Sequence, residues 1–117
     1  MKISIVMTVY NGEKYLKEQI DSFLNQTLLP DEIIICDDCS SDKTIKIIKK
    51  YEKNSLVKIK FFKNKYNLGF TKNFEKAISK STGDIIFLSD QDDVWYKNKV
   101  ETVIKKFKSS PMANLII

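Results

Sequence analysis

The sequence predicts an α/β domain built on an open, mainly parallel sheet flanked by helices. Four short apolar runs recur along the 117 residues, and the stretches between them repeat apolar residues at helical spacing. Three of the runs are almost continuously apolar, as expected for strands covered on both faces. Strands that alternate with helices in this way pair in parallel through right-handed crossovers. The ligand site of such a sheet is expected at the carboxyl ends of its strands.

The elements follow in a regular strand and helix order, without repeats or low-complexity linkers. Strands are expected at residues 3–9, 32–36, 57–62 and 85–88. The third alternates with lysines in "VKIKF", which is typical of a strand at the edge of a sheet. The closing "MANLII" resembles the start of a further strand. Four apolar faces indicate the helices: Leu16, Ile20, Phe23 and Leu24; Ile45, Ile48 and Tyr51; Phe70, Phe74, Ala77 and Ile78; Val100, Val103, Ile104 and Phe107.

Length and composition indicate one globular domain. A chain of 117 residues is long enough to bury a single core. Its 43% apolar and 30% charged residues exclude disordered, collagen-like and disulfide-dense classes. No segment approaches the roughly 18 continuous apolar residues of a membrane span, and the first ten residues lack a signal-peptide cleavage site. We expect no membrane span in this chain and a cytoplasmic location, with the inner face of the membrane reached through other parts or partners.

The charged residues narrow the chemistry. All 20 basic residues are lysine, arginine and histidine are absent, and the net charge is +5. This composition excludes histidine triads, histidine metal sites and bidentate arginine contacts to phosphate or guanine. The lysines stand mostly at helix-face and edge-strand spacing, which is typical of a solvated surface. We therefore expect no nucleic-acid partner.

Polar clusters follow the apolar runs. The first run ends in "TVYNG", the second in "CDDCSSD" and the fourth in "SDQDD", while the third leads into "NKYNLG". Because the carboxyl ends of parallel strands meet at one edge, these clusters should lie together. Random placement would scatter them over both ends of the sheet, so the convergence predicts a functional site.

The acidic cluster after the fourth run indicates a divalent-cation site. Hard cations such as Mg²⁺ and Mn²⁺ take carboxylate oxygens, and they commonly use one or two protein carboxylates together with substrate phosphates. Asp90 and Asp92 could both reach one ion from an irregular loop. The alternative is that these acids stabilise the N-terminus of a helix near 97–108, where Asn98 and Glu101 resemble a capping box.

The cluster after the second run combines acids with two cysteines. Asp42 can cap the following helix, whereas Asp37 and Asp38 could accept hydrogen bonds from a ribose hydroxyl or a base imide N–H. Cys36 and Cys39 have the spacing of a redox pair, but the acids between them should raise the thiol pKa and disfavour the thiolate. Two cysteines without histidine cannot form a four-ligand zinc site. We predict two free thiols.

The first cluster adds an aromatic ring at a turn. Tyr10 could stack on a base, or it could simply pack against the protein, and Asn11 could shape the loop. One edge of the sheet would then offer an aromatic ring, strand-end acids and a metal-binding loop. A nucleotide diphosphate joined to another group fits all three. Without arginine to neutralise the pyrophosphate, a bound metal becomes more necessary.

Four stretches, in this order and spacing, resemble the nucleotide-binding half of family-two, inverting glycosyltransferases of the Rossmann-like GT-A fold. They are "IVMTVYNGEKYLKEQIDSFLNQTL", "DEIIICDDCSSDKT", "NLGFTKNF" and "STGDIIFLSDQDDVW", and they cover almost the whole chain. The resemblance implies a base pocket at Thr8 and Tyr10, with Asp38 bonded to the base. Asp90 would hold ribose or metal, and Asp92 would be the chief metal ligand. The implied nucleotide-binding set is Thr8, Val9, Tyr10, Asn11, Asp37, Asp38, Lys72 and Asp90.

The same resemblance implies the reaction and its partners. The donor would be a UDP- or dTDP-linked sugar, the cofactor Mn²⁺ or Mg²⁺, and the acceptor a saccharide or a lipid-linked saccharide. The "DQDDVW" form looks like that of transferases of bacterial surface polysaccharides, including rhamnosyl transferases. The family often has Ala-Arg-Asn where this chain has Thr71, Lys72 and Asn73, so the planar guanidinium is lost.

The resemblance also implies that residues 1–117 are only the donor-binding portion of a transferase domain. The family's acceptor side and catalytic base lie beyond the point that this chain reaches, so no residue here is expected to be the base. Two alternatives remain: a non-catalytic nucleotide-binding fragment, and a receiver-type phosphoacceptor domain. The receiver alternative is weakened because its acids normally end the first strand and because no strand-end lysine follows here.

Overall fold

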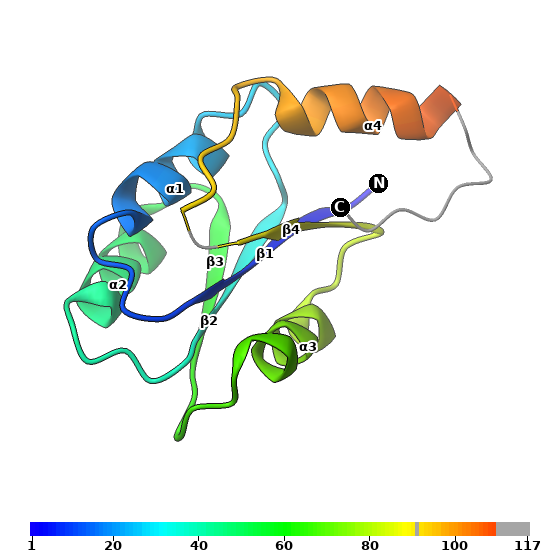
Figure 1. Ribbon diagram of the computed structural model, residues 1–117. Coiled ribbons are helices and arrows are strands. Elements are labelled where there is room, and N and C mark those ends of the chain that lie inside the picture. Colours follow the sequence, from blue (N-terminus) through cyan, green and yellow to red (C-terminus); the bar gives the residue numbers. More distant parts are fainter. Residues whose placement is uncertain (91, 110–117) are drawn as a thin grey trace.

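The fold is a four-stranded parallel sheet with helices on both faces (Figure 1). The computed structural model describes residues 1–90 and 92–109. The strands β1 (Ile3–Val9), β2 (Glu32–Asp37), β3 (Lys58–Lys63) and β4 (Ile85–Ser89) lie in the order β3-β2-β1-β4. All three pairings are parallel. The predicted α/β class and the strand positions are confirmed, to within one residue at each end.

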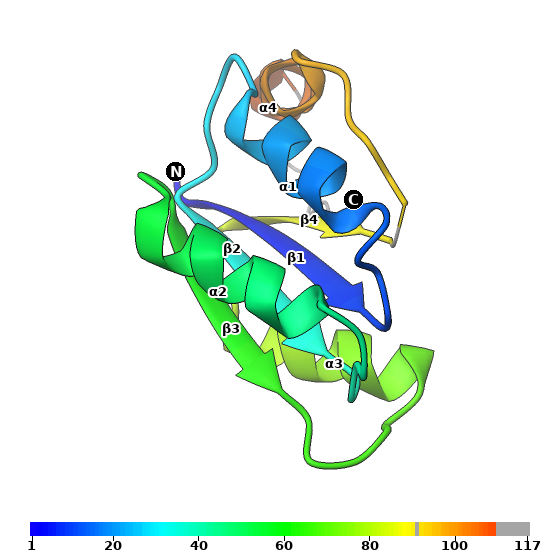
Figure 2. The same ribbon diagram turned by 90° about the vertical axis from the view of Figure 1, so that its left-hand side faces the viewer.

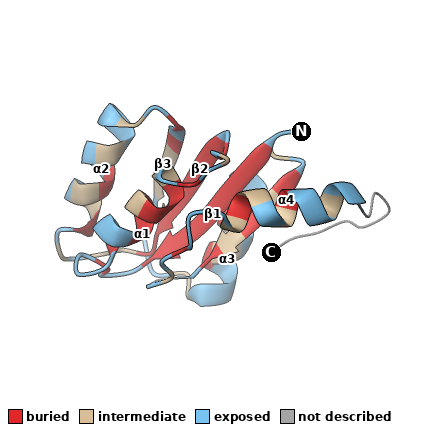
Figure 3. Ribbon diagram, turned by 90° about the horizontal axis from the view of Figure 1, so that it is seen from above, coloured by how far each residue is buried: buried red, intermediate tan, exposed pale blue. Residues whose placement is uncertain are grey.

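The helices divide unequally between the two faces of the sheet. They are α1 (Leu16–Leu24), α2 (Thr44–Asn54), α3 (Phe70–Lys80) and α4 (Lys99–Ser109). The larger core joins one face of the sheet to α1, α2 and α4, whereas α3 covers the other face with a smaller apolar cluster (Figure 2). Buried residues fill β1 and β2, and exposed residues lie on the outer sides of the helices (Figure 3). The sheet is therefore the middle layer of three.

The two edges of the sheet differ. The edge position of β3, predicted from its alternating lysines, is confirmed. The expectation that the fourth strand is covered on both faces holds in part: among the described residues β4 lies at the other edge, one of its faces is buried, and Ile86 and Leu88 on the other face are half-buried against the smaller apolar cluster. The further strand expected at "MANLII" lies outside the described residues.

Helix α3 departs from its predicted apolar face. Phe70, which the spacing placed against the core, is 62% exposed, while the polar Asn73 is buried. The reason is local, because Phe70 is the first residue of the helix and lies at the carboxyl edge of the sheet. Its ring packs edge-to-face on Phe74, with ring centroids 5.0 Å apart. This part of α3 therefore faces a hollow rather than the core.

A buried carboxylate ties the opposite, amino-terminal edge together. Glu32 accepts hydrogen bonds from Ser4 Oγ at 2.6 Å and from the Thr82 backbone N–H at 2.7 Å. Its carboxylate also pairs with Lys60 Nζ at 2.8 Å. These contacts link β1, β2, β3 and the segment before β4, and they stabilise the amino-terminal edge of the sheet.

Within residues 1–90 and 92–109, no helix is long and apolar enough to cross a membrane.

Candidate functional site

The polar clusters converge at the carboxyl edge of the sheet, as predicted. They surround a hollow of about 290 Å³ near the point where the chain order reverses, between β1 and β4. A larger hollow of about 520 Å³ lies between α1 and α2, and no predicted site residue lines it. The smaller hollow is therefore the candidate site. Its lining residues are Thr8, Val9, Tyr10, Asp38, Asn67, Gly69, Phe70, Asn73 and Asp90.

The loop after β1 is shaped by Asn11. This residue has a φ of 47°, a left-handed conformation that asparagine tolerates better than most residues. Its side-chain oxygen accepts a hydrogen bond from the Ser41 backbone N–H at 2.8 Å, and its own N–H donates to Ser40 Oγ at 2.8 Å. These contacts fix the loop after β1 against the loop after β2. Thr8, Val9 and half-exposed Tyr10 thereby form one wall of the hollow.

The carboxylate of Asp38 organises the part of the lining that comes from residues 67–69 and the start of α3. One oxygen accepts from the Leu68 backbone N–H at 2.7 Å and from Asn64 Nδ2 at 3.0 Å. The other accepts from the Gly69 backbone N–H at 3.0 Å. Burial on its own would raise the pKa of Asp38, but these hydrogen bonds outweigh it and hold the pKa below its usual value. The side chain is thus ionised and fixes the turn that leads into α3.

Two buried amides extend this network into α3. Asn64 Nδ2 also donates to Asn73 Oδ1 at 2.8 Å, and Asn73 Nδ2 donates to the Cys36 carbonyl at 3.1 Å. Lys76 Nζ donates to Asn64 Oδ1 at 2.6 Å. The sequence analysis placed Phe70 on an apolar helix face and quoted Asn64, Asn67, Gly69 and Asn73 within longer stretches, but it named none of the five as a site residue. A polar residue on the apolar face of an amphipathic helix, as at Asn73, was the available signal.

The acidic loop after β4 is anchored to α1. Gln19 Nε2 donates to Ser89 Oγ at 3.0 Å and to the Asp90 carbonyl. Further along, the Trp95 backbone N–H donates to Ser22 Oγ at 3.1 Å, and the Trp95 ring packs on Phe23 with centroids 4.7 Å apart. The loop leaves β4 from a fixed point, which sets the position of Asp90 at the hollow.

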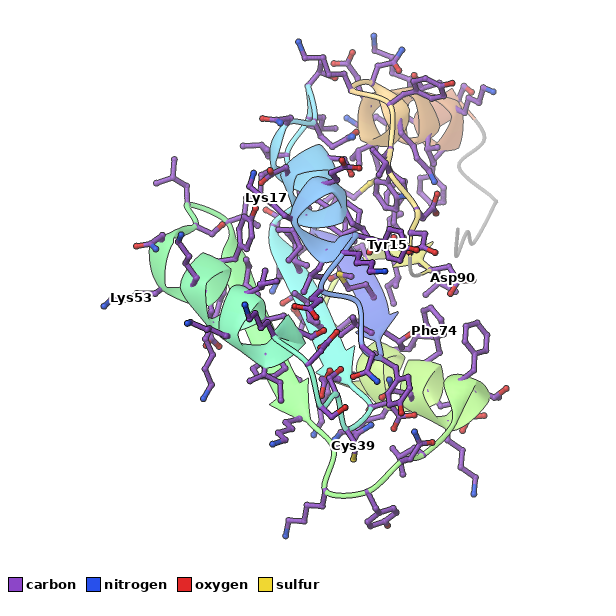
Figure 4. The ribbon with its side chains drawn as sticks, turned by 60° about the vertical axis from the view of Figure 1, so that its left-hand side comes forward. Tyr15, Lys17, Cys39, Lys53, Phe74 and Asp90 are labelled. Carbon is purple, nitrogen blue, oxygen red and sulfur yellow. The ribbon has the colours of Figure 1, made fainter. Side chains whose placement is uncertain are left out.

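The three acids of this loop have different positions. Asp90 is exposed and lines the hollow, and in Figure 4 the Phe74 ring projects from α3 toward the end of β4 where Asp90 lies. Asp92 is exposed, with a left-handed φ of 74°. Asp93 Oδ2 accepts a hydrogen bond from Trp95 Nε1 at 3.2 Å. The third acid therefore has a structural role, which leaves Asp90 and Asp92 as the candidate metal ligands.

A protein-only metal cage is absent from the described part of the chain, where no three acidic or cysteine side chains gather closely enough to hold an ion. Asp90 and Asp92 fit the other common arrangement, in which one or two carboxylates hold the cation together with substrate phosphates. Gln91, between them, lies outside the described residues.

The structure places the predicted nucleotide-binding residues in two groups. Thr8, Val9, Tyr10, Asp38 and Asp90 line the hollow together. The others do not line it: Asn11 shapes the adjoining loop, Lys72 is exposed on α3, and Asp37 is fully buried, where its carboxylate accepts from the Ser40 backbone N–H at 2.9 Å. The nucleotide roles of all these residues stay predictions.

The loop after β2 bears on two further predictions, the capping role of Asp42 and the state of the two cysteines. Asp42 Oδ1 accepts from the Thr44 backbone N–H at 2.9 Å, so it serves the start of α2 as expected. Cys36 and Cys39 are not bonded to each other. Burial raises the pKa of the Cys36 thiol to about 11. The predicted disfavoured thiolate is therefore correct for Cys36, but burial is the cause rather than repulsion by the intervening acids.

The comparison with known families decides the class of the protein. Residues 4–116 match the sequence pattern that defines Glycosyl transferase family 2. The chain belongs to this family. The predicted resemblance and the GT-A fold are thus confirmed, and the receiver alternative has no support.

Relatives and solved structures of the family 2 domain agree. The dTDP-rhamnosyl transferase RfbG of Shigella flexneri is 37% identical over 103 residues, covering 84% of this chain and 35% of the relative. The UDP-Glc:alpha-D-GlcNAc-diphosphoundecaprenol beta-1,3-glucosyltransferase WfgD of Escherichia coli is 34% identical over 102 residues, covering 87% and 39%. The structure of Staphylococcus aureus TarS 1–349 with UDP-GlcNAc matches with a TM-score of 0.84 and 30% identity, covering 93% and 32%. The chain thus spans between 32% and 39% of the length of these three proteins.

Proposed function

We propose that residues 1–117 bind a pyrimidine nucleotide diphosphate sugar in the hollow of about 290 Å³, as the donor-binding portion of a family 2 transferase. The observation that carries this proposal is the meeting of the ionised Asp38 and the exposed Asp90 around one hollow, on opposite sides of the β1 end. One acid faces the turn before α3 and the other begins the acidic loop. This arrangement of the two acids suits a ligand with a base at one end and phosphates at the other.

Asp38 suits a uracil or thymine base. A carboxylate offers about four acceptor positions, and Asp38 uses three of them on Leu68, Gly69 and Asn64. The remaining position can accept the imide N–H that uracil and thymine carry. Tyr10, 49% exposed at the hollow, offers its ring for stacking on the base. This geometry suits uracil and thymine alike.

Asp90 and Asp92 are proposed as the residues that hold Mn²⁺ or Mg²⁺ with the donor pyrophosphate. A bound divalent cation supplies Lewis-acid stabilisation of a nucleoside diphosphate leaving group. The lysine-only composition leaves no guanidinium to share this charge. Asp90 would contact the ribose or the ion from its place at the hollow, and the exposed Asp92 would complete the ligand set.

Transfer with inversion needs a base on the face of the sugar opposite the leaving group. The acids described at the carboxyl edge all belong to the donor side, so we propose that the base and the acceptor site come from the rest of the protein. The proposed acceptor is a saccharide or a lipid-linked saccharide of bacterial surface polysaccharide synthesis, as the names of RfbG and WfgD suggest. A cytoplasmic location belongs to the same proposal.

Calorimetry tests donor binding and the metal together. We expect UDP or dTDP to bind in the presence of Mn²⁺ and to lose most of its affinity in EDTA. ADP should bind far more weakly, because adenine lacks the imide N–H. Equal affinity with and without EDTA would overturn the metal role, and equal affinity for ADP would overturn the role of Asp38.

Two variants locate the metal. Asp92→Ala should abolish the dependence on Mn²⁺, whereas the control Glu52→Ala changes an exposed acid on α2 and should leave binding unchanged. If Asp92→Ala binds like the parent, the chief ligand is another residue.

A further inference from the structure

The positive charge of the chain is concentrated in one continuous segment. Residues 43–80 contain twelve lysines and two glutamates, a net charge of +10, whereas residues 1–42 carry −5 and residues 81–117 are balanced. The spacing pattern that predicted an evenly solvated surface misses this separation. The segment forms α2, β3 and α3, which are the edge strand of the sheet and one helix on each of its faces (Figure 2).

Most of this charge is not neutralised within the protein. Of the twelve lysines, Lys60 is the one with an ion pair among the described residues, to Glu32 at 2.8 Å. Lys76 donates to Asn64, and Lys80 lies 5.2 Å from the centroid of the Phe62 ring. Lys53 extends from α2 into solvent (Figure 4). Lysines on an edge strand protect it from aggregation, but most of the twelve lie outside β3, on α2, α3 and the adjoining loops, so protection of the edge does not account for this excess.

The lysines border a hollow at the carboxyl end of β3. It measures about 300 Å³, and its lining includes Lys63, Lys65 and Lys76 together with the ring of Tyr66. A second hollow of about 500 Å³ shares Lys63, Asn64 and Lys65. Among the described residues, no carboxylate lines either hollow. A phosphate group placed there would meet several ammonium groups at once.

Two exposed apolar side chains flank the same strand. Leu56, just before β3, is fully exposed, and Tyr66, just after it, is 71% exposed. The strand between them, six residues of β3, is about 20 Å long. Lysines beside exposed leucine and tyrosine are the composition of surfaces that lie at a lipid–water interface. We call Lys53, Leu56, Lys58, Lys63, Lys65 and Tyr66 the basic edge.

We propose that the basic edge docks on an anionic phospholipid bilayer, with lipid phosphates in the hollow at Lys63 and Lys65 and with Leu56 and Tyr66 at the acyl boundary. A bilayer explains the uncompensated charge and both exposed apolar residues, whereas a nucleic acid would explain the charge and Tyr66 but not the fully exposed Leu56. The edge is distinct from the hollow at Asp38 and Asp90, so docking does not depend on the donor. It would hold the donor site close to acceptors that reside in the membrane.

Vesicle sedimentation tests the proposal on the 117-residue chain. We expect binding to vesicles of equal parts phosphatidylcholine and phosphatidylglycerol, little binding to phosphatidylcholine alone, and weakening as salt rises. Each lysine near an anionic surface strengthens binding about fivefold. The variant Lys58→Gln, Lys63→Gln, Lys65→Gln should therefore bind on the order of 100-fold more weakly.

A matched variant separates the basic edge from general charge. Lys97→Gln, Lys106→Gln, Lys108→Gln removes the same charge from the α4 side, at exposed positions, and should change binding only slightly. Leu56→Ser should weaken vesicle binding without any change of charge, and it serves if the triple variant fails to fold. Circular dichroism verifies the fold of each variant. Equal loss in both triple variants, or equal binding to neutral vesicles, would overturn the proposal. Tight binding to single-stranded DNA without vesicle binding would do the same and would identify a nucleic-acid surface instead.

Discussion

Glu32 should make the fold sensitive to acid in a defined range. Burial on its own would raise the pKa of this carboxyl, but hydrogen bonds from Lys60, Ser4 and Thr82 outweigh it and lower the pKa from 4.5 to about 2. A lowered pKa means that the folded state favours the ionised form. The stabilisation is complete above pH 4.5, and it is lost as the pH falls toward 2. The shift corresponds to about 3 kcal/mol of unfolding free energy.

The variant Glu32→Gln isolates this contribution, because the amide keeps the shape of the side chain and cannot ionise. Urea unfolding should show a variant less stable than the parent by about 3 kcal/mol at neutral pH. The difference should shrink toward zero near pH 2, where the parent carboxyl is protonated as well. Glu52→Gln, at an exposed position on α2, is the control and should match the parent throughout. A difference that stays constant with pH would show that the ionisation of Glu32 does not carry the effect.

Three further predictions follow from the site. Asn73→Ala should lower the unfolding free energy by about 2–3 kcal/mol, because two buried hydrogen bonds are lost. Asn54→Ala, at an exposed helix end, is the control. Equal thermal midpoints for the two variants would contradict the role of the network. Alkylation without reductant should modify Cys39 faster than Cys36, whose thiol is buried with a raised pKa, and a mass lower by two hydrogens would reveal a disulfide instead. Residues 1–117, incubated with labelled nucleotide sugars and candidate acceptors, should transfer little or no sugar compared with a chain extended downstream. Acceptor positioning and a general base together accelerate such a reaction by many orders of magnitude. Comparable rates for the two chains would place the base within residues 1–117.

The fold could be predicted from sequence because its signals are local and repeated. Apolar runs such as 3–9 and 32–36 are too continuous for a half-exposed strand, and the lysines of β3 marked an edge. The position of β4 was harder to assign. Whether an apolar strand is central depends on what pairs with it, and neighbours in the sheet are separated in sequence. The concentration of lysines in residues 43–80 is visible in the sequence, but the place of that segment at the β3 edge of the sheet comes from the structure.

The candidate site was predicted only in part, for a physical reason. Residues at strand ends, such as Thr8 and Asp38, are placed by the sheet itself, so topology alone brings them together. Asn64 and Asn73 enter through side-chain hydrogen bonds between segments far apart in sequence, which no periodicity reveals. The sequence also could not show which of the neighbouring acids accept hydrogen bonds from the protein itself. The structure shows that Asp37 and Asp93 do.

Because the two edges of the sheet differ, further strands can be added at one edge more readily than at the other. A strand can add to a sheet edge only where backbone groups are unpaired and the side chains permit pairing. The lysines along β3 would hinder an additional strand there. On β4 the described residues include no second neighbour beyond β1, and Ile86 and Leu88 are half-buried rather than charged. Any module that continues this sheet would therefore join beside β4. It would arrive next to Asp90, and it would leave the lysine side of the molecule facing outward.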